Sequence, residues 1–181
     1  MKDSTRAFSR GQIIYRAGDE GHAWRILTGS VRLDLRIDDE RMFGGLARPG
    51  DVIGAEAIAE DAYAFDAVAL SECRLAPWAE DSGSADRDSV LQLLAAVERR
   101  AAEALALRRG NALDRVRRLI LMLADGRGNT IAIPLARDIA EMTDLTAETV
   151  SRAFTVLRRQ GTLTKHGSRF GLVQRGELQA I

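Results

Sequence analysis

Glu148, Ser151 and Arg152 are the residues of this 181-residue chain whose types and spacing are best suited to recognising another molecule. They lie three and four positions apart, so a helix would place them on one face. A carboxylate accepts from the amino group of cytosine or adenine, a hydroxyl donates or accepts, and a guanidinium pairs bidentately with guanine. The set therefore predicts hydrogen bonds to base edges in a DNA groove.

The sequence around these residues predicts a helix that would hold them. Thr146 is a good N-cap, and Gly161 after two arginines is a typical stop signal. Apolar residues recur at a helical period that gives one buried stripe: Val150, Ala153 or Phe154, and Leu157. The opposite face keeps short or hydrogen-bonding side chains.

The neighbouring segments complete a larger pattern. A short helix from Leu135, a tight turn at Thr143-Asp144 and the longer second helix predict a helix-turn-helix. The run after Gly161 alternates around residues 166–168 and predicts a two-stranded hairpin, or wing. The alternative interpretation is an ordinary amphipathic helix with solvated charges, followed by a surface hairpin.

The run LTAETVSRAFTVLRRQGTL resembles the DNA-binding domain of the Crp/Fnr family, and E-T-V-S-R is its most specific part. Matched by position, Glu148, Ser151 and Arg152 fall where the Fnr-type branch has its base-reading residues. That branch reads palindromes similar to TTGAT-N4-ATCAA. The cyclic-AMP receptor branch has Gly in place of Ser151, so the resemblance is closer to Fnr.

Contacts with the DNA backbone are expected from residues at the helix start and beside the hairpin tip, namely Thr146, Thr149, Lys165 and Arg169. The chain departs from the family pattern at Asp144, where the turn usually has Gly. Asp tolerates a left-handed backbone better than most residues, so we expect the turn to form. The helix near Leu135 has no capping side chain.

Composition indicates a globular chain with two unlike halves. Residues 1–107 hold 13 Lys and Arg against 19 Asp and Glu, a net charge of −6, whereas residues 108–181 hold 13 against 7, a net charge of +6. A basic C-terminal half suits phosphate contacts. No apolar run approaches a membrane span, the N-terminus has no apolar signal core, and Cys73 is the single cysteine. We therefore expect a cytoplasmic protein.

Residues 8–84 predict a β domain. Short alternating runs, the clearest from Val31 to Ile37, are separated by Gly and Asp turns, which is typical of a sandwich or barrel. The landmarks Ile14-Tyr15-Arg16-x-Gly18-Asp19 and Gly50-Asp51-x-Ile53-Gly54 resemble the sensor domain of the same family, a small jelly roll of the cyclic-nucleotide-binding type. The fold class is therefore α+β.

The sequence argues against the ligands known for such barrels. Ala55 follows Ile53-Gly54 where cyclic-nucleotide binders have Glu, and Tyr63-Ala64 falls near their phosphate-binding Arg-Ser pair. Cys73 alone does not supply an iron–sulfur site, and we interpret His22 as a solvated turn residue rather than a haem ligand. With two distant histidines there is no metal or catalytic set, so we predict no enzyme, no metal and no cofactor.

Residues 87–109 predict a long helix whose apolar stripe suits a two-fold seam, formed by Val90, Leu94, Val97, Ala101 and Ala104. Packing on its own barrel alone is the other interpretation. Residues 111–178 would form the winged helix-turn-helix domain, after a hinge at Gly110-Asn111. Three outward arginines of its first helix are either solvated or bound to backbone, namely Arg115, Arg117 and Arg118.

Together these features predict a homodimeric regulator of transcription that binds double-stranded DNA and works with RNA polymerase, without cyclic AMP or an iron–sulfur cluster. Two alternatives stay open. An unidentified small effector could occupy the barrel, or the C-terminal domain could dock protein rather than DNA.

Overall fold

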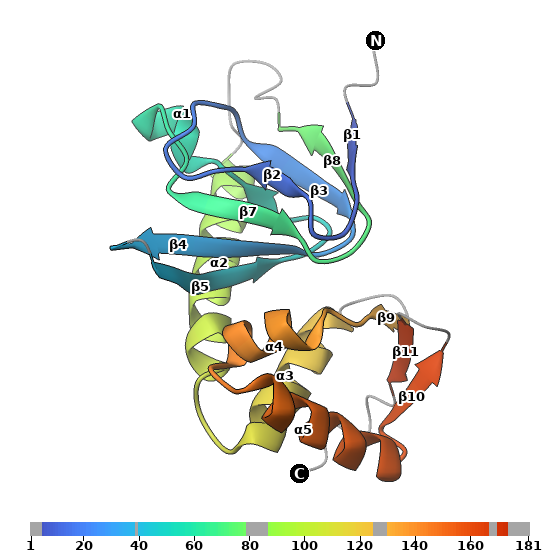
Figure 1. The fold of residues 1–181 in the computed structure, drawn as a ribbon. Coiled ribbons are helices and arrows are strands. Elements are labelled where there is room, and N and C mark those ends of the chain that lie inside the picture. The colour runs from blue at the N-terminus through green and yellow to red at the C-terminus, as the bar shows by residue number, and fades with distance from the viewer. Residues whose placement is uncertain (1–4, 39, 79–86, 125–129, 167–169, 174–181) are drawn as a thin grey trace. The chain divides into compact units, whose positions relative to one another are not determined.

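The protein forms two compact units, Met1–Ala104 and Leu105–Ile181, drawn in Figure 1. The computed structural model describes residues 5–38, 40–78, 87–124, 130–166 and 170–173, with the backbone alone at 87–89, 165, 166, 170 and 172. None of the helices in these ranges is long and apolar enough to cross a membrane.

The first unit is built from two antiparallel sheets, each of four strands. One sheet has the order β1-β8-β3-β6 and the other β2-β7-β4-β5. The strands are β1 Arg6–Phe8, β2 Ile13–Tyr15, β3 Trp24–Thr28, β4 Val31–Ile37, β5 Glu40–Ala47, β6 Val52–Ile53, β7 Phe65–Ala69 and β8 Cys73–Pro77. Because consecutive strands such as β3 and β4 lie in different sheets, the chain closes a jelly-roll-like barrel, as the sequence predicts.

The core of this unit lies between the two sheets. Alternate residues of β3, β4 and β8 point inward, among them Trp24, Ile26, Val31, Leu33 and Leu75, all less than a tenth exposed. The alternation of β4 also predicts that the charged residues of its other face lie in solvent, which holds for Arg36 but is wrong for two others. Arg32 and Asp34 are buried as well, and they neutralise each other in an ion pair of 2.6 Å.

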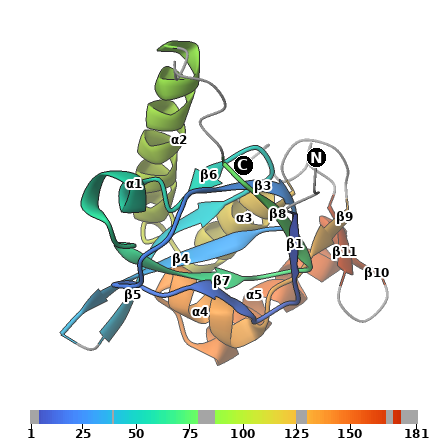
Figure 2. The ribbon, with the colours of Figure 1, turned by 90° about the horizontal axis from the view of Figure 1, so that it is seen from above.

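Two helices complete the first unit. The short α1, Glu56–Glu60, follows β6, and α2, Arg87–Ala106, runs along the side of the barrel where β6 and α1 lie (Figure 2). The helix ends three residues before the predicted end at residue 109. The backbone N–H groups of Arg108 and Arg109 donate to the carbonyl oxygens three residues earlier instead of four, which is the pattern of a turn. Gly110 then has a φ of +88°, so the backbone leaves the helix there.

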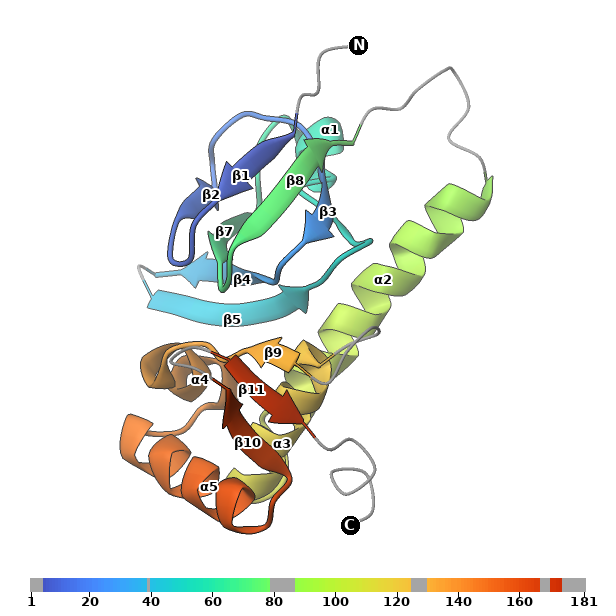
Figure 3. The ribbon, with the colours of Figure 1, turned by 90° about the vertical axis from the view of Figure 1, so that its right-hand side faces the viewer.

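The second unit packs three helices against a small sheet (Figure 3). The helices are α3 Ala112–Leu123, α4 Ala136–Thr143 and α5 Ala147–Arg159, and the strands are β9 Thr130–Ala132, β10 Leu163–His166 and β11 Phe170–Val173. The predicted two-stranded wing is therefore part of a three-stranded antiparallel sheet, in the order β10-β11-β9. Asn111 and Asp114 form a capping box that starts α3.

Candidate nucleic-acid interface

Helix α5 divides into a buried and an exposed face, as its periodicity predicts. Val150, Ala153, Phe154 and Leu157 are less than a tenth exposed and anchor the helix on the core of its unit. Glu148, Ser151, Arg152 and Thr155 are exposed on the other side. The burial of the apolar stripe therefore fixes which side chains the helix offers to a partner.

The start of α5 is capped by Thr146. Its Oγ1 accepts the backbone N–H of Thr149 at 3.2 Å, and the two threonine hydroxyls lie 2.9 Å apart. Thr146 is exposed and Thr149 half-buried, so the capping residue is accessible at the start of the helix. Such a helix start suits an anion, because unpaired N–H groups and the helix dipole both favour negative charge.

Replacing Thr146 with Ala is expected to lower the free energy of unfolding by about 1 kcal/mol, because the N–H of Thr149 loses its acceptor. Urea unfolding followed by circular dichroism measures this change. The variant Thr146→Ser keeps the hydroxyl and should unfold within about 0.5 kcal/mol of the unchanged protein. Equal losses in both variants would mean that the cap is not the stabilising contact.

Glu148 and Arg152 pair with each other across one helical turn. Arg152 Nη2 lies 2.5 Å from Glu148 Oε1, while both side chains remain about three-quarters exposed. Ser151 donates its hydroxyl to the backbone oxygen of Ala147 at 2.9 Å. The guanidinium is thus held over the face that also carries Ser151, and its remaining N–H groups are available to an acceptor.

The turn before α5 adopts the conformation expected of it. Asp144 has φ 53° and ψ 52°, the left-handed region, and its N–H donates to the carbonyl oxygen of Ala140. Helix α4 begins at Leu135 without a side-chain cap, as the sequence also predicts. The turn therefore forms with Asp in place of the usual Gly.

The wing residues are only partly described. Lys165 lies in β10, but its side chain is outside the described part, and Arg169 lies outside the described residues altogether. Their assignment to DNA phosphates therefore stays a prediction, as do the base-reading roles of Glu148, Ser151 and Arg152.

The first unit contains a cavity of about 350 Å³ between the barrel and α2. Its lining is mostly apolar, and its polar members include Tyr15, Glu56 and Arg100. Ala64, which falls near the phosphate-binding pair of cyclic-nucleotide binders, also lines it. Arg100 is the one cation among the described lining residues, and it already donates to the carbonyl oxygen of Val52 at 3.2 Å. The lining therefore fits a cyclic nucleotide poorly.

Tyr15 is the unusual residue of this cavity. It is 6% exposed, its ring stacks on Tyr63 at 3.8 Å, and its hydroxyl has no hydrogen-bond partner within the described part of the chain. Burial, with the nearby charge of Glu56, raises the pKa of Tyr15 above its ordinary value. The hydroxyl is therefore a neutral, buried hydrogen-bond donor that has no acceptor among the described residues.

The two residues considered for metal chemistry have ordinary surroundings. Cys73 is buried and donates to the backbone oxygens of Ser30 and Ser71, and burial raises the pKa of its thiol. His22 is exposed, and its ring lies 4.3 Å from that of Trp24. No cluster of three or more His, Cys, Asp or Glu side chains suited to a metal occurs in the residues that the structure describes.

Comparison with known proteins decides the family. Residues 5–82 match the family described as the cyclic nucleotide-binding domain, and residues 114–181 match the Crp-like helix-turn-helix domain. The chain is 33% identical to the nitrogen fixation regulation protein FixK of Azorhizobium caulinodans, covering 90% of this chain and 72% of that protein. The chain belongs to the Crp/Fnr family of transcription regulators. It is a DNA-binding transcription regulator of the Crp/Fnr type.

Two further relatives extend this finding within the Crp/Fnr family. The transcriptional regulator LdrP of Thermus thermophilus is 31% identical, over 87% of this chain and 86% of its own. The solved structure of FixK2 from Bradyrhizobium japonicum is 27% identical with a TM-score of 0.77, covering 99% of this chain and 96% of that one. The predictions of the family, of the α+β fold and of DNA binding are thereby confirmed.

Proposed function

We propose that the protein binds a palindromic site similar to TTGAT-N4-ATCAA as a homodimer, without cyclic AMP or an iron–sulfur cluster, and acts on RNA polymerase. The observation that carries the proposal is the exposed face of α5, where Arg152 is held by Glu148 next to Ser151. These three side chains would read bases, and Thr146, Thr149, Lys165 and Arg169 would contact the DNA backbone.

Helix α2 supports the homodimer. Its predicted seam residues Val90, Leu94 and Val97 are all 46–53% exposed, although each is apolar. Ala101 is exposed beside them, and Ala104 is half-buried. Leu91 and Leu105, outside the predicted seam, are 51% and 68% exposed and widen the same stripe. Val97 and Ala101 also line the cavity beside the barrel, and the stripe continues from there over Val90, Leu91, Leu94 and Leu105. An exposed apolar stripe of this length on a helix of 20 residues fits a second copy of the same helix.

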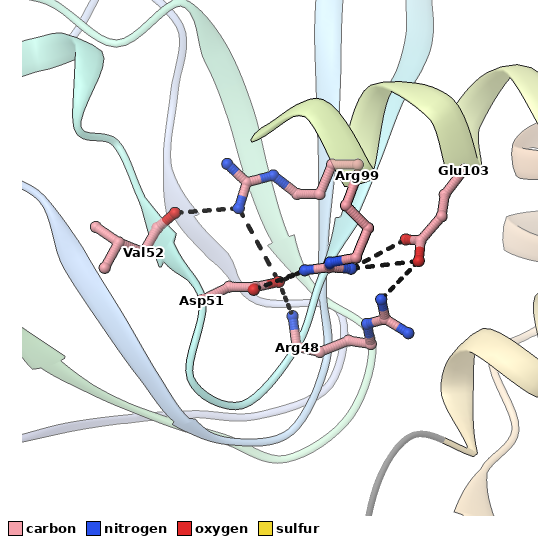
Figure 4. Close-up of polar contacts among 6 residues, drawn as sticks. Arg48, Asp51, Val52, Arg99 and Glu103 are labelled. Atoms are coloured by element: carbon pink, nitrogen blue, oxygen red, sulfur yellow. Dashed lines mark hydrogen bonds and ion pairs between the residues drawn. The ribbon is translucent and has the colours of Figure 1, made fainter. Parts of the chain in front are cut away.

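An ion cluster that holds α2 on the barrel supports activity without an effector (Figure 4). The cluster comprises Arg48 and Asp51 of the turn before β6, and Arg99, Arg100 and Glu103 of α2. Arg99 lies 2.7 Å from Asp51 and 3.1 Å from Glu103, and Arg48 lies 2.7 Å from Glu103. These contacts attach the helix to the barrel through the chain's own side chains.

Electrostatics indicates how tightly the cluster is coupled. Burial alone would lower the pKa of Arg99, but the hydrogen bonds and charges of Asp51 and Glu103 outweigh it and raise that pKa above its ordinary value. Burial lowers the pKa of Arg100 below its ordinary value, and the negative charge of Asp51 partly offsets this decrease. Asp51 therefore accepts from Arg99 and, at 4.0 Å, also offsets the charge of Arg100.

Replacing Asp51 with Asn is expected to destabilise the protein by about 1–3 kcal/mol, between the values for exposed and buried ion pairs. The substitution leaves three clustered arginines with Glu103 as their remaining carboxylate in the cluster. Thermal unfolding measures the change, with Asp61→Asn, at an exposed position after α1, as the control. Equal melting temperatures for the two variants would contradict the role given to the cluster.

The proposal is tested by titrating the purified, ligand-free protein against a labelled TTGAT-N4-ATCAA duplex and a scrambled duplex at two salt concentrations. We expect tight binding to the first duplex, weaker binding to the second, and a loss of affinity with salt, since phosphate contacts release counterions. Equal weak binding to both would mean that an effector is missing or another site is read. No binding even at low salt would favour a domain that docks protein.

A second candidate function is favoured by the cavity beside Tyr15. A buried phenol without a partner, next to about 350 Å³ of space, suits a small molecule that brings an acceptor. In that case DNA binding would depend on an effector. The variant Tyr15→Phe separates the two candidates, because it removes the donor while keeping the ring. Tight and equal binding of the palindrome by the ligand-free protein and the ligand-free variant supports activity without an effector, whereas weak binding by both supports the second candidate.

A further inference from the structure

One arginine of α3 connects two distant stretches of backbone in the second unit. Arg115 Nε donates to the carbonyl oxygen of Gly110 at 3.1 Å. Its Nη1 donates to the carbonyl oxygens of Thr143 and Asp144 at 3.1 and 3.3 Å. Gly110 precedes α3, whereas Thr143 ends α4 and Asp144 forms the turn before α5. A single guanidinium therefore holds the start of one helix and the turn of the helix-turn-helix together.

The turn needs such a donor for two reasons. The last carbonyls of a helix have no partner within it and carry partial negative charge, which a cation stabilises. Helix α4 has no basic residue in its own last turn. In addition, Asp144 is in the left-handed region at φ 53°, a conformation that costs energy for any residue but Gly. Arg115 supplies from another helix the cation that α4 itself lacks.

The other contacts of the turn show what Arg115 adds. The Thr143 hydroxyl donates to the carbonyl oxygen of Ile139 at 2.6 Å, and the N–H groups of Asp144 and Leu145 both reach the carbonyl oxygen of Ala140. These bonds satisfy earlier carbonyls of α4. The carbonyl oxygens of Thr143 and Asp144 are the two that accept from Arg115, and the cap of α5 follows two residues later at Thr146.

We propose that Arg115 is a positioning residue for DNA recognition. It fixes the turn at Asp144 and, through it, the first turn of α5, which carries Glu148 and precedes Arg152. The inference rests on the proposed base-reading role of that face. For Arg115 it also answers the question left open by the sequence, because its guanidinium donates to the protein backbone. Arg117, which the sequence places outward, is instead buried.

Arg118 provides a matched control on the same helix. Its Nη1 donates to the carbonyl oxygens of Ala106, at 2.9 Å, and of Arg109. It therefore binds backbone carbonyls as Arg115 does, and it lies one turn further along α3. Its acceptors belong to the segment before Gly110 and not to the turn between α4 and α5.

The test compares Arg115→Ala, Arg118→Ala and the unchanged protein by their affinities for the TTGAT-N4-ATCAA duplex and for a scrambled one. We expect Arg115→Ala to lower the ratio of the two affinities roughly tenfold, since hydrogen bonds from a charged donor are lost. Arg118→Ala should keep the ratio within about twofold, because the turn retains its donor. Urea unfolding of each variant corrects the affinities for the folded fraction.

A rescue variant distinguishes positioning from general stability. Gly adopts the left-handed conformation without strain, so Asp144→Gly added to Arg115→Ala should recover part of the lost ratio, while Asp144→Gly alone changes it little. A ratio that is unchanged in Arg115→Ala, or lowered equally in Arg118→Ala, overturns the proposal.

Hydrogen exchange keeps this test separate from the test of DNA recognition. If the unchanged protein does not discriminate between the duplexes, the proposed function fails, and the amides of residues 143–149 still report on the turn. The proposal expects faster exchange there in Arg115→Ala than in Arg118→Ala. Equal exchange in the two variants would contradict it, whatever the DNA measurements show.

Discussion

Arg152→Ala is expected to abolish discrimination at one base pair of each half-site while the protein stays folded. The side chain is about three-quarters exposed, and its ion pair with Glu148 is equally exposed, so its loss should change the free energy of unfolding by less than about 1 kcal/mol. A bidentate contact with guanine is worth about 1–3 kcal/mol of discrimination. A homodimer makes that contact twice, so the effect on the full site is roughly doubled.

The measurement is a set of titrations with duplexes that carry each of the four base pairs at the position in question, in both half-sites. The control is Arg159→Ala, which removes the same charge from the exposed last turn of α5. Only Arg152→Ala should bind the four duplexes alike, whereas Arg159→Ala should keep the order of preference of the unchanged protein. A wild-type order of preference in Arg152→Ala would assign base reading to other residues.

The second unit could largely be predicted from the sequence because its signals are local. The stripe of Val150, Phe154 and Leu157 places α5 and selects its exposed face, and Thr146 marks its start. Each of these signals depends on residues within one or two helical turns, where spacing determines geometry. The left-handed turn at Asp144 was also predictable, since few residues other than Gly tolerate that conformation.

The contacts that connect distant segments could not be predicted in this way. Asp51 meets Arg99 across 48 positions, and Arg115 meets Thr143 across 28, and no periodicity couples such pairs. Alternation in β4 likewise identifies its inward residues but does not show that Arg32 and Asp34 are buried too. The tertiary fold determines which polar groups meet. The charge of Arg115 alone therefore did not decide whether its side chain is solvated or bound to backbone.

The second large expected effect is that the substitution Leu94→Asp in helix α2 abolishes the dimer. Leu94 is 53% exposed in one chain, so the substitution should leave the barrel folded, but it places a charge in the middle of the proposed seam. Two recognition helices on one palindrome bind with an avidity of about 100- to 10,000-fold over one. We therefore expect Leu94→Asp to be monomeric and to lose at least about 100-fold in affinity for the palindrome.

The control for the seam is Gln92→Asp. It introduces the same charge at an exposed position of α2 that a helix of 3.6 residues per turn places about 100° from Leu91 and about 160° from Leu94, on the side away from the stripe. Sedimentation equilibrium gives the mass of each variant, and titration with a palindrome and with a single half-site separates pairing from base reading. Because base reading stays intact in the monomer, its affinity for the half-site should equal that of the unchanged protein. A Leu94→Asp dimer with unchanged affinity for the palindrome would assign the exposed stripe of α2 to another partner.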